Sequence, residues 1–195
     1  MGILIASPLI LLTRLEEVIT KKRAGIIFGW SREIISLIPT ILGELIRLGY
    51  YWGVCSKVSP NASFLFGSML ARQDTIIGAG TVIGAYSIIG YAEIGEQVLI
   101  GSRASIISGK YLHGRPEERA EGKSIIRERD VISIGNNSWI GQDAILMASV
   151  GENCTVGAGS VVYKTVPDNT TVLGNPARKV NVEMRKKKEQ ALDKD

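Results

Sequence analysis

One histidine, His113, has the side chain best suited to acid–base chemistry in this sequence. It is the only histidine among 195 residues. An imidazole has an unperturbed pKa of about 6.5, so it takes up and releases a proton readily at neutral pH. His113 lies in a polar, highly charged segment, residues 109–130, which interrupts an otherwise regular pattern. Its uniqueness and its position make His113 the candidate general base of a catalytic site.

The sequence on both sides of this segment follows a six-residue period. An isoleucine or valine begins each hexad, a glycine follows most of them, and the fourth residue after each is usually small. The aliphatic positions are Ile77, Ile83, Ile89, Ile94, Ile100, Ile106, Ile134, Ile140, Val150, Val156 and Val162. The small positions are Thr81, Ser87, Ala104, Ser138, Ala144, Cys154 and Ser160. A period of six fits neither a helix nor an alternating strand and indicates a repeat architecture.

This period predicts a parallel β-helix in which three hexads form one triangular coil. The aliphatic side chains point inward and stack from coil to coil, and each one, if fully buried, contributes roughly 1.5–3 kcal/mol. Glycine after each aliphatic residue suits a corner where a larger side chain would clash or where φ is positive. We expect a mainly β fold with helices at both ends of the chain.

The pattern divides the chain into three parts. Residues 1–56 are expected to form a helical segment, and residues 57–180 a β-helix domain with an extended loop at 109–130. Residues 181–195 are expected to form a charged C-terminal helix. Residues 64–75 do not fit the six-residue count, so a bulge or insertion is expected there, and the repeat is expected to fade after Val162.

Two helical regions are expected in the amino-terminal segment. Thr13 and Glu16 form a capping-box pattern that predicts a helix over residues 14–23. A second helical region is expected over residues 31–48, with a break at Pro39 and an end at Gly49.

The broad apolar face of this segment has two interpretations. It either covers the open end of the β-helix, whose strand edges need partners, or it lies on a membrane surface. Basic residues nearby favour the second interpretation, while Glu16, Glu17, Glu33 and Glu44 count against it.

Several protein classes are excluded by composition. No apolar run reaches the ~20 residues of a spanning helix, and the amino-terminal stretch lacks a secretory signal pattern. Two cysteines provide no disulfide framework, and Cys154 occupies a small packing position. We therefore expect a cytoplasmic protein, with the inner face of the membrane as the alternative location. The formal charge of +4 is not accompanied by a nucleic-acid-binding motif, so a nucleic-acid partner is not expected.

Residues 157–162 (Gly-Ala-Gly-Ser-Val-Val), leading to residues 174–178 (Gly-Asn-Pro-Ala-Arg), resemble the hexapeptide-repeat acyltransferases. That family folds as a left-handed β-helix, an exception to the usual right-handed connection of parallel strands. Residues 113–119 and 134–141 are similar to galactoside and maltose O-acetyltransferases, although Gly114 stands where that group usually has proline. The resemblance implies a homotrimer with clefts between adjacent prisms.

The resemblance also implies a reaction and a site. Acetyl-CoA would be the acyl donor, and a sugar hydroxyl of a surface polysaccharide or its precursor would be the acceptor. His113 would be the general base, and the backbone N–H of Gln142 would face the thioester oxygen. The remaining implied contacts are Trp139 lining the cleft, Ala158, Gly159 and Ser160 along pantetheine, Lys164 and Arg178 at the phosphates, and Asn175 and Pro176 at the adenine end.

Other functions remain as alternatives. The acceptor could be a sugar amine or serine, and a non-catalytic β-helix scaffold would explain the hexads without the histidine. Zinc enzymes with this fold take several histidines per metal, and this chain has one, so no metal site is expected. No Walker or dinucleotide glycine motif is present.

Overall fold

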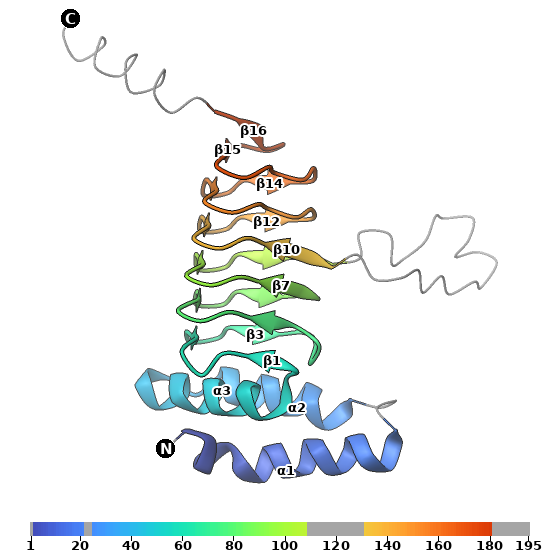
Figure 1. Cartoon of the computed structure of the whole chain (residues 1–195). Coiled ribbons are helices and arrows are strands. Elements are labelled where there is room, and N and C mark those ends of the chain that lie inside the picture. Colours follow the sequence, from blue (N-terminus) through green and yellow to red (C-terminus); the bar gives the residue numbers. More distant parts are fainter. Residues whose placement is uncertain (1, 22–24, 109–130, 181–195) are drawn as a thin grey trace, which may run out of the picture.

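The structure, a computed structural model, describes residues 2–21, 25–108 and 131–180. Three helices lie at the amino end of the described chain, and a stack of coils rises from them (Figure 1). The helices are α1 (Gly2–Thr20), α2 (Ile26–Ser36) and α3 (Thr40–Val54). His113, the expected loop at 109–130 and the expected helix at 181–195 lie outside the described residues.

The strands form three sheets, named A, B and C here, which are the three faces of the prism. Sheet A contains β1 (Lys57–Val58), β4 (Ile76–Ile77), β7 (Ala92–Ile94) and β10 (Ile132–Ile134). Sheet B contains β2 (Ser63–Phe64), β5 (Val82–Ile83), β8 (Leu99–Ile100), β11 (Trp139–Ile140), β13 (Thr155–Val156), β15 (Thr171–Leu173) and β16 (Arg178–Lys179). Sheet C contains β3 (Met69–Leu70), β6 (Ile88–Ile89), β9 (Ser105–Ile106), β12 (Ile145–Leu146) and β14 (Val161–Val162). Neighbouring strands are parallel, except that β16 runs antiparallel to β15.

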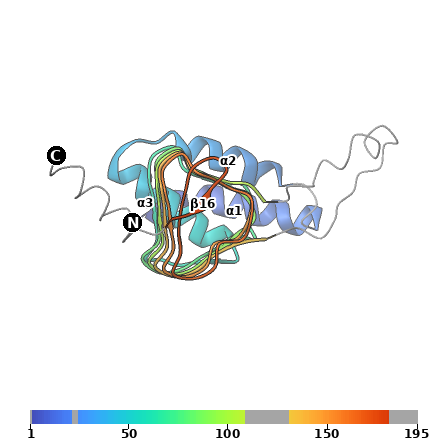
Figure 2. The same ribbon diagram turned by 90° about the horizontal axis from the view of Figure 1, so that it is seen from above.

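The expected ladder of inward aliphatic side chains is confirmed. Ile83 pairs with Ile100, which pairs with Ile140 and then with Val156, so equivalent residues stack in register on sheet B. All of the predicted aliphatic positions are buried, and the predicted small positions are buried as well. Seen along the axis, successive coils superimpose closely (Figure 2). The core is therefore a column of methyl groups, as the hexads predicted.

The glycine after each aliphatic residue is needed for close approach between coils. A Cβ built on Gly84 would lie 2.5 Å from the carbonyl carbon of Gly101 in the next coil. The positive φ angles occur two residues later, at Tyr86, Arg103 and Asp143, where the chain turns from sheet B to sheet C. Glycine is therefore required after the aliphatic residue because a Cβ would clash with the next coil, and not because φ is positive at that position.

The repeat is more regular and longer than we expected. Residues 64–75 contain Phe64 and Leu70 in register with Ile83 and Ile89, so the predicted irregularity reduces to one extra residue before Ile77. Sequence counting missed this because Phe and Leu replace the β-branched residues. The repeat also continues beyond Val162, because residues 166 and 172 are buried valines that pair with the coil below.

The helices cover the open edge of the first coil. The buried Arg47 on α3 donates through Nε to the Phe64 carbonyl at 2.9 Å, and Arg32 on α2 donates to the Ala71 carbonyl at 3.0 Å. In return, Leu70 N–H donates to the Tyr51 hydroxyl at 3.2 Å, and Gly67 N–H donates to the Ser36 carbonyl at 3.0 Å. The cap interpretation is confirmed, since these contacts satisfy edge groups of the first coil.

The predicted capping box at Thr13 is wrong. Thr13 lies inside α1, buried, where its hydroxyl contacts the Tyr50 hydroxyl at 2.9 Å. Glu16 caps the following helix instead, since its carboxylate accepts from Ile26 and Ile27 N–H at 2.8 and 2.9 Å. The helix begins at Gly2 rather than residue 14, and Pro8 lies within it.

The predicted helix break at Pro39 is confirmed, but the predicted end at Gly49 is wrong. The helix α3 continues to Val54. A Cβ on Gly49 would lie 2.5 Å from the backbone nitrogen of Ile3, so Gly49 is the place where α1 crosses α3 closely. Close helix packing, rather than helix termination, requires glycine here.

Candidate functional site

The turns between sheets B and C, which we call the BC corner, bring several of the predicted site residues together. The BC corner comprises residues 65–68, 84–87, 101–104, 141–144 and 157–160. Gln142 and Gly159 occupy adjacent coils there, and Gly159 N–H donates to the Gln142 carbonyl at 2.8 Å. Ala158 and Gly159 are exposed, so the corner above Gln142 presents backbone with almost no side chain over it.

The backbone N–H of Gln142 is the predicted fixed donor of the site. Within the part of the chain that the structure describes, this N–H has no hydrogen-bond acceptor. At the corner between sheets A and B, by contrast, the equivalent N–H groups of Glu96 and Glu152 donate to the side chains of Asn136 and Asp168. The BC corner therefore leaves available a donor of the kind that stabilises a developing oxyanion.

An ion pair that the sequence analysis missed lies beside Gln142. Arg103 and Asp143 stack in adjacent coils, with Nε to Oδ1 and Nη2 to Oδ2 distances of 2.7 Å. The hydrogen bonds from the Arg103 guanidinium hold the pKa of the Asp143 carboxyl below its usual range. Only the equivalent positions of the two residues in their coils could have indicated this pair. Arg103 lies three residues after the inward Ile100, and Asp143 lies three residues after the inward Ile140.

Ser160 has a structural role at the top of this corner. Its side chain is buried, and its hydroxyl accepts a hydrogen bond from Gly174 N–H at 3.0 Å. This bond ties the final turn, with its exposed Asn175 and cis Asn175–Pro176 peptide bond, to the coil of Ala158 and Gly159. The predicted pantetheine and adenine residues therefore follow one another along the stack.

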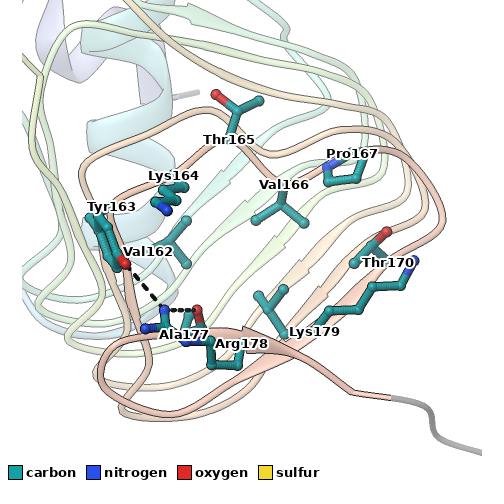
Figure 3. A pocket seen from close by; sticks show the side chains of 11 residues that line it. Val162, Tyr163, Lys164, Thr165, Val166, Pro167, Thr170, Ala177, Arg178 and Lys179 are labelled. Carbon is teal, nitrogen blue, oxygen red and sulfur yellow. Dashed lines mark hydrogen bonds between the residues drawn. The ribbon is translucent and has the colours of Figure 1, made fainter.

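Lys164 and Arg178 meet elsewhere, around Tyr163 at the carboxyl end of the stack (Figure 3). Arg178 Nη1 donates to the Tyr163 hydroxyl at 3.2 Å, and Lys164 Nζ lies 5.6 Å from the centre of the Tyr163 ring. The hydrogen bond from Arg178 lowers the pKa of the Tyr163 phenol. Two cations and a phenol at one place form a surface suited to an anion.

These residues border an open cavity of about 400 Å³ at the end of the prism. The cavity is lined by Val162, Tyr163, Lys164, Thr165, Val166, Pro167, Thr170, Val172, Ala177, Arg178 and Lys179. Its floor consists of the inward valines of the last coils, so it is the open end of the core (Figure 3). Lys164 and Arg178 stand among the residues that line this cavity.

Trp139 points outward from sheet B, as predicted, and is half exposed. It stands between Leu99 and Thr155 on the neighbouring strands, next to the BC corner. Its indole is therefore available to line a cleft beside Gln142.

The structure thus separates the predicted residues into two groups. Gln142, Ala158 and Gly159 lie on the BC corner. Lys164 comes after β14 and lies in the turn between sheets C and A. The described residues that flank the segment containing His113, which are Ser108 and Val131, lie on that second turn as well. Within one prism, the two groups lie on different edges.

Comparison with known proteins supports the repeat and the fold. A family model described as "Hexapeptide repeat of succinyl-transferase" matches residues 131–164. No curated protein sequence matches the chain significantly.

Solved structures share the fold at low identity. A maltose O-acetyltransferase from Clostridium difficile 630 is 21% identical, with 85% of this chain and 88% of that chain covered and a TM-score of 0.58. A serine-to-alanine mutant of AntD, an N-acyltransferase from Bacillus cereus in complex with dTDP-4-amino-4,6-dideoxyglucose and coenzyme A, is 20% identical. It covers 71% of this chain and 86% of its own, with a TM-score of 0.50. PerB from Caulobacter crescentus, in complex with CoA and GDP-perosamine, is 19% identical and covers 64% of this chain, which spans 54% of PerB, with a TM-score of 0.46.

Proposed function

We propose that this hexapeptide-repeat protein is an acetyl-CoA-dependent acetyltransferase whose acceptor is a sugar hydroxyl of a glycan. The observation that carries the proposal is the BC corner, where the backbone N–H of Gln142 has no acceptor among the described residues and Ala158 and Gly159 leave the backbone exposed above it. A thioester needs such a donor at its oxygen, and a pantetheine arm needs such a smooth path. The family match at residues 131–164, which include Gln142 and Ala158, is consistent with this assignment.

In the proposed reaction, the acceptor hydroxyl oxygen attacks the thioester carbon while His113 removes the hydroxyl proton. The carbonyl oxygen gains negative charge, which the Gln142 N–H stabilises. The carbon–sulfur bond then breaks, His113 returns the proton to the sulfur, and the products are the acetyl ester and free coenzyme A. Removing one oxyanion donor costs about 10²–10³ in kcat in other enzymes.

We further propose that the site is shared between neighbouring chains of a homotrimer. The described residues next to the His113 segment lie on the turn between sheets C and A, whereas Gln142 lies on the BC corner. A single site that contains both His113 and Gln142 would therefore form where the edge of one prism packs against a neighbouring prism. Trp139, half exposed beside the BC corner, would line that cleft.

Two alternatives are distinguished by the product. Transfer to a sugar amine, the reaction class of the N-acyltransferase AntD, gives an amide rather than an ester. A non-catalytic scaffold would release no coenzyme thiol with any acceptor. Hydroxylamine cleaves acetyl esters and leaves amides intact, so it separates the first alternative from our proposal.

The test is coenzyme thiol release from acetyl-CoA across a panel of soluble glycans, amino sugars and serine. We expect release above the hydrolysis background with a neutral glycan and a hydroxylamine-sensitive acetyl group on the product. His113→Ala should reduce release by about 10²-fold or more while coenzyme binding stays unchanged. Unchanged turnover in His113→Ala would remove the base assignment, and an absence of release with every acceptor would favour the scaffold.

A further inference from the structure

The outer face of α1 is an exposed aliphatic surface, which we call the α1 face. It consists of Ile3, Leu4, Ile5, Leu11, Leu12, Leu15, Val18 and Ile19. Leu4, Leu11 and Val18 are 75%, 68% and 77% exposed. Their spacing of seven residues places them in one row along the helix, which is about 28 Å long at 1.5 Å per residue.

The opposite side of α1 is also apolar and packs on α3. Gly2 and Ala6 are buried there, and Leu9 and Ile10 pack against the core. A helix that is apolar all round is normally buried on every side. Here α1 is the outermost layer of the amino end, with α2 and α3 between it and the solenoid (Figure 1). Its outer face therefore needs a covering that the described chain does not supply.

The acidic residues of α1 would not repel an apolar or anionic partner, because their carboxylates already accept hydrogen bonds within the protein. Glu16 is occupied as the cap of α2, accepting from two backbone N–H groups. Glu17 is largely buried and accepts from Arg14 at 2.9 Å and from Gln73 at 2.6 Å. Arg14 is the only exposed charged side chain within the described α1, and the exposed Lys21 follows its end. Arg14 is paired with Glu17, so Lys21 is the exposed cation that this margin offers to an anionic surface.

The chemistry of the α1 face fits lipid better than a folded protein. Protein interfaces depend on aromatic and arginine anchors that fill pockets. The α1 sequence contains no aromatic residue, and its one arginine is engaged with Glu17 and the Gly53 carbonyl. An exposed aliphatic helix face with Lys21 just beyond its end can enter the boundary between headgroups and acyl chains. No described helix is long and apolar enough to cross a membrane. The exposed row from Leu4 to Val18 runs along α1, so the helix would lie in the plane of the surface.

We propose that the α1 face docks on an anionic lipid bilayer, with α1 parallel to the membrane and the solenoid projecting away from it. Figure 1 shows α1 lying across the amino end of the stack, and Figure 2 shows the coils above it along one axis. Copies related by an axis parallel to the stack would present their α1 faces to the same plane, which increases avidity. This docking does not depend on the reaction proposed for the BC corner.

The test is flotation of the full chain with vesicles of phosphatidylcholine alone or with added phosphatidylglycerol. We expect binding that is stronger with phosphatidylglycerol and weakens with salt. Leu11→Glu and Val18→Glu should each reduce vesicle binding by about tenfold or more. The matched control is Leu37→Glu, since Leu37 is 71% exposed but follows α2 in the layer between α1 and the solenoid, and it should bind as the wild type does.

Leu11→Ser and Val18→Ser serve as milder variants if the glutamates disturb folding, which far-UV circular dichroism reports. Thiol release with a soluble acceptor should persist in all of these variants, so a failure of docking is separable from a failure of the chemistry. The proposal is overturned if the wild-type chain does not float, or if Leu37→Glu loses as much binding as Leu11→Glu. It is also overturned if Leu11→Glu changes only the oligomeric state in lipid-free solution, because the occupant would then be a second copy.

Discussion

The substitution Gly101→Ala tests how the stacking of coils positions the proposed oxyanion donor. Gly101 lies directly below Gln142, and an added Cβ would be 2.5 Å from the Gln142 nitrogen and 2.8 Å from its Cα. Ordinary contacts of this kind lie near 3.5 Å, so the Gln142 backbone would have to move by about 1 Å. The stability cost should be about 1–3 kcal/mol, as for other overpacked sites. A displacement of that size at a reacting group costs about 10²-fold in rate.

The matched control is Gly135→Ala, at the corner between sheets A and B. There the added Cβ would lie 2.7 Å from the Cα of Glu152, so the steric conflict is similar but distant from Gln142. Urea unfolding should report similar losses of stability for both variants. Thiol release should fall about 10²-fold only for Gly101→Ala. Equal activity losses in the two variants, or a normal rate in Gly101→Ala, would refute the role of the Gln142 backbone.

Four further predictions concern individual side chains. Arg178→Ala should raise the dissociation constant of coenzyme A by about tenfold through loss of a charge-assisted phosphate contact, measured by calorimetry. The same change should raise the pKa of Tyr163, because the hydrogen bond that lowers it is lost, and ultraviolet titration of the phenol would detect the shift. Arg47→Met should lower the free energy of unfolding by about 3 kcal/mol in urea, because the carbonyls of residues 35, 38 and 64 lose their buried donor. Cys55 should react with a thiol reagent at pH 8 only as fast as the protein opens, because burial raises its pKa to about 12, and rapid labelling of the native protein would contradict this.

The hexads allowed the prism to be predicted because one steric rule repeats in every coil. An inward aliphatic residue, a glycine without room for a Cβ and a small buried residue are visible in sequence at each step. The hexads were not recognised where a residue other than isoleucine or valine fills the inward position, as Phe64 and Leu70 do in the first coil. In the helices, the predicted end at Gly49 is wrong because the residue that requires glycine there, Ile3, is far away in the sequence.

The site could be predicted less completely, because its parts depend on contacts between coils. Gln142 and Ala158 each lie two residues after an inward residue, Ile140 and Val156, so the proximity of Gln142 to the turn of Ala158 and Gly159 was within reach of the sequence. The pairing of Arg103 with Asp143 joins residues 40 positions apart across the 109–130 segment, and no local pattern marks it. The exposure of the α1 face could not be predicted for the same reason, since only the fold shows which side of this largely apolar helix packs on α3.

The structure of the protein bound to coenzyme A would test the central claim most directly. We predict that the coenzyme follows the BC corner, with its sulfur beside the Gln142 N–H, its pantetheine arm over Ala158 and Gly159, and its adenine end at Asn175 and Pro176. Coenzyme bound along another edge of the prism, or inserted into the cavity above Val162, would contradict the account.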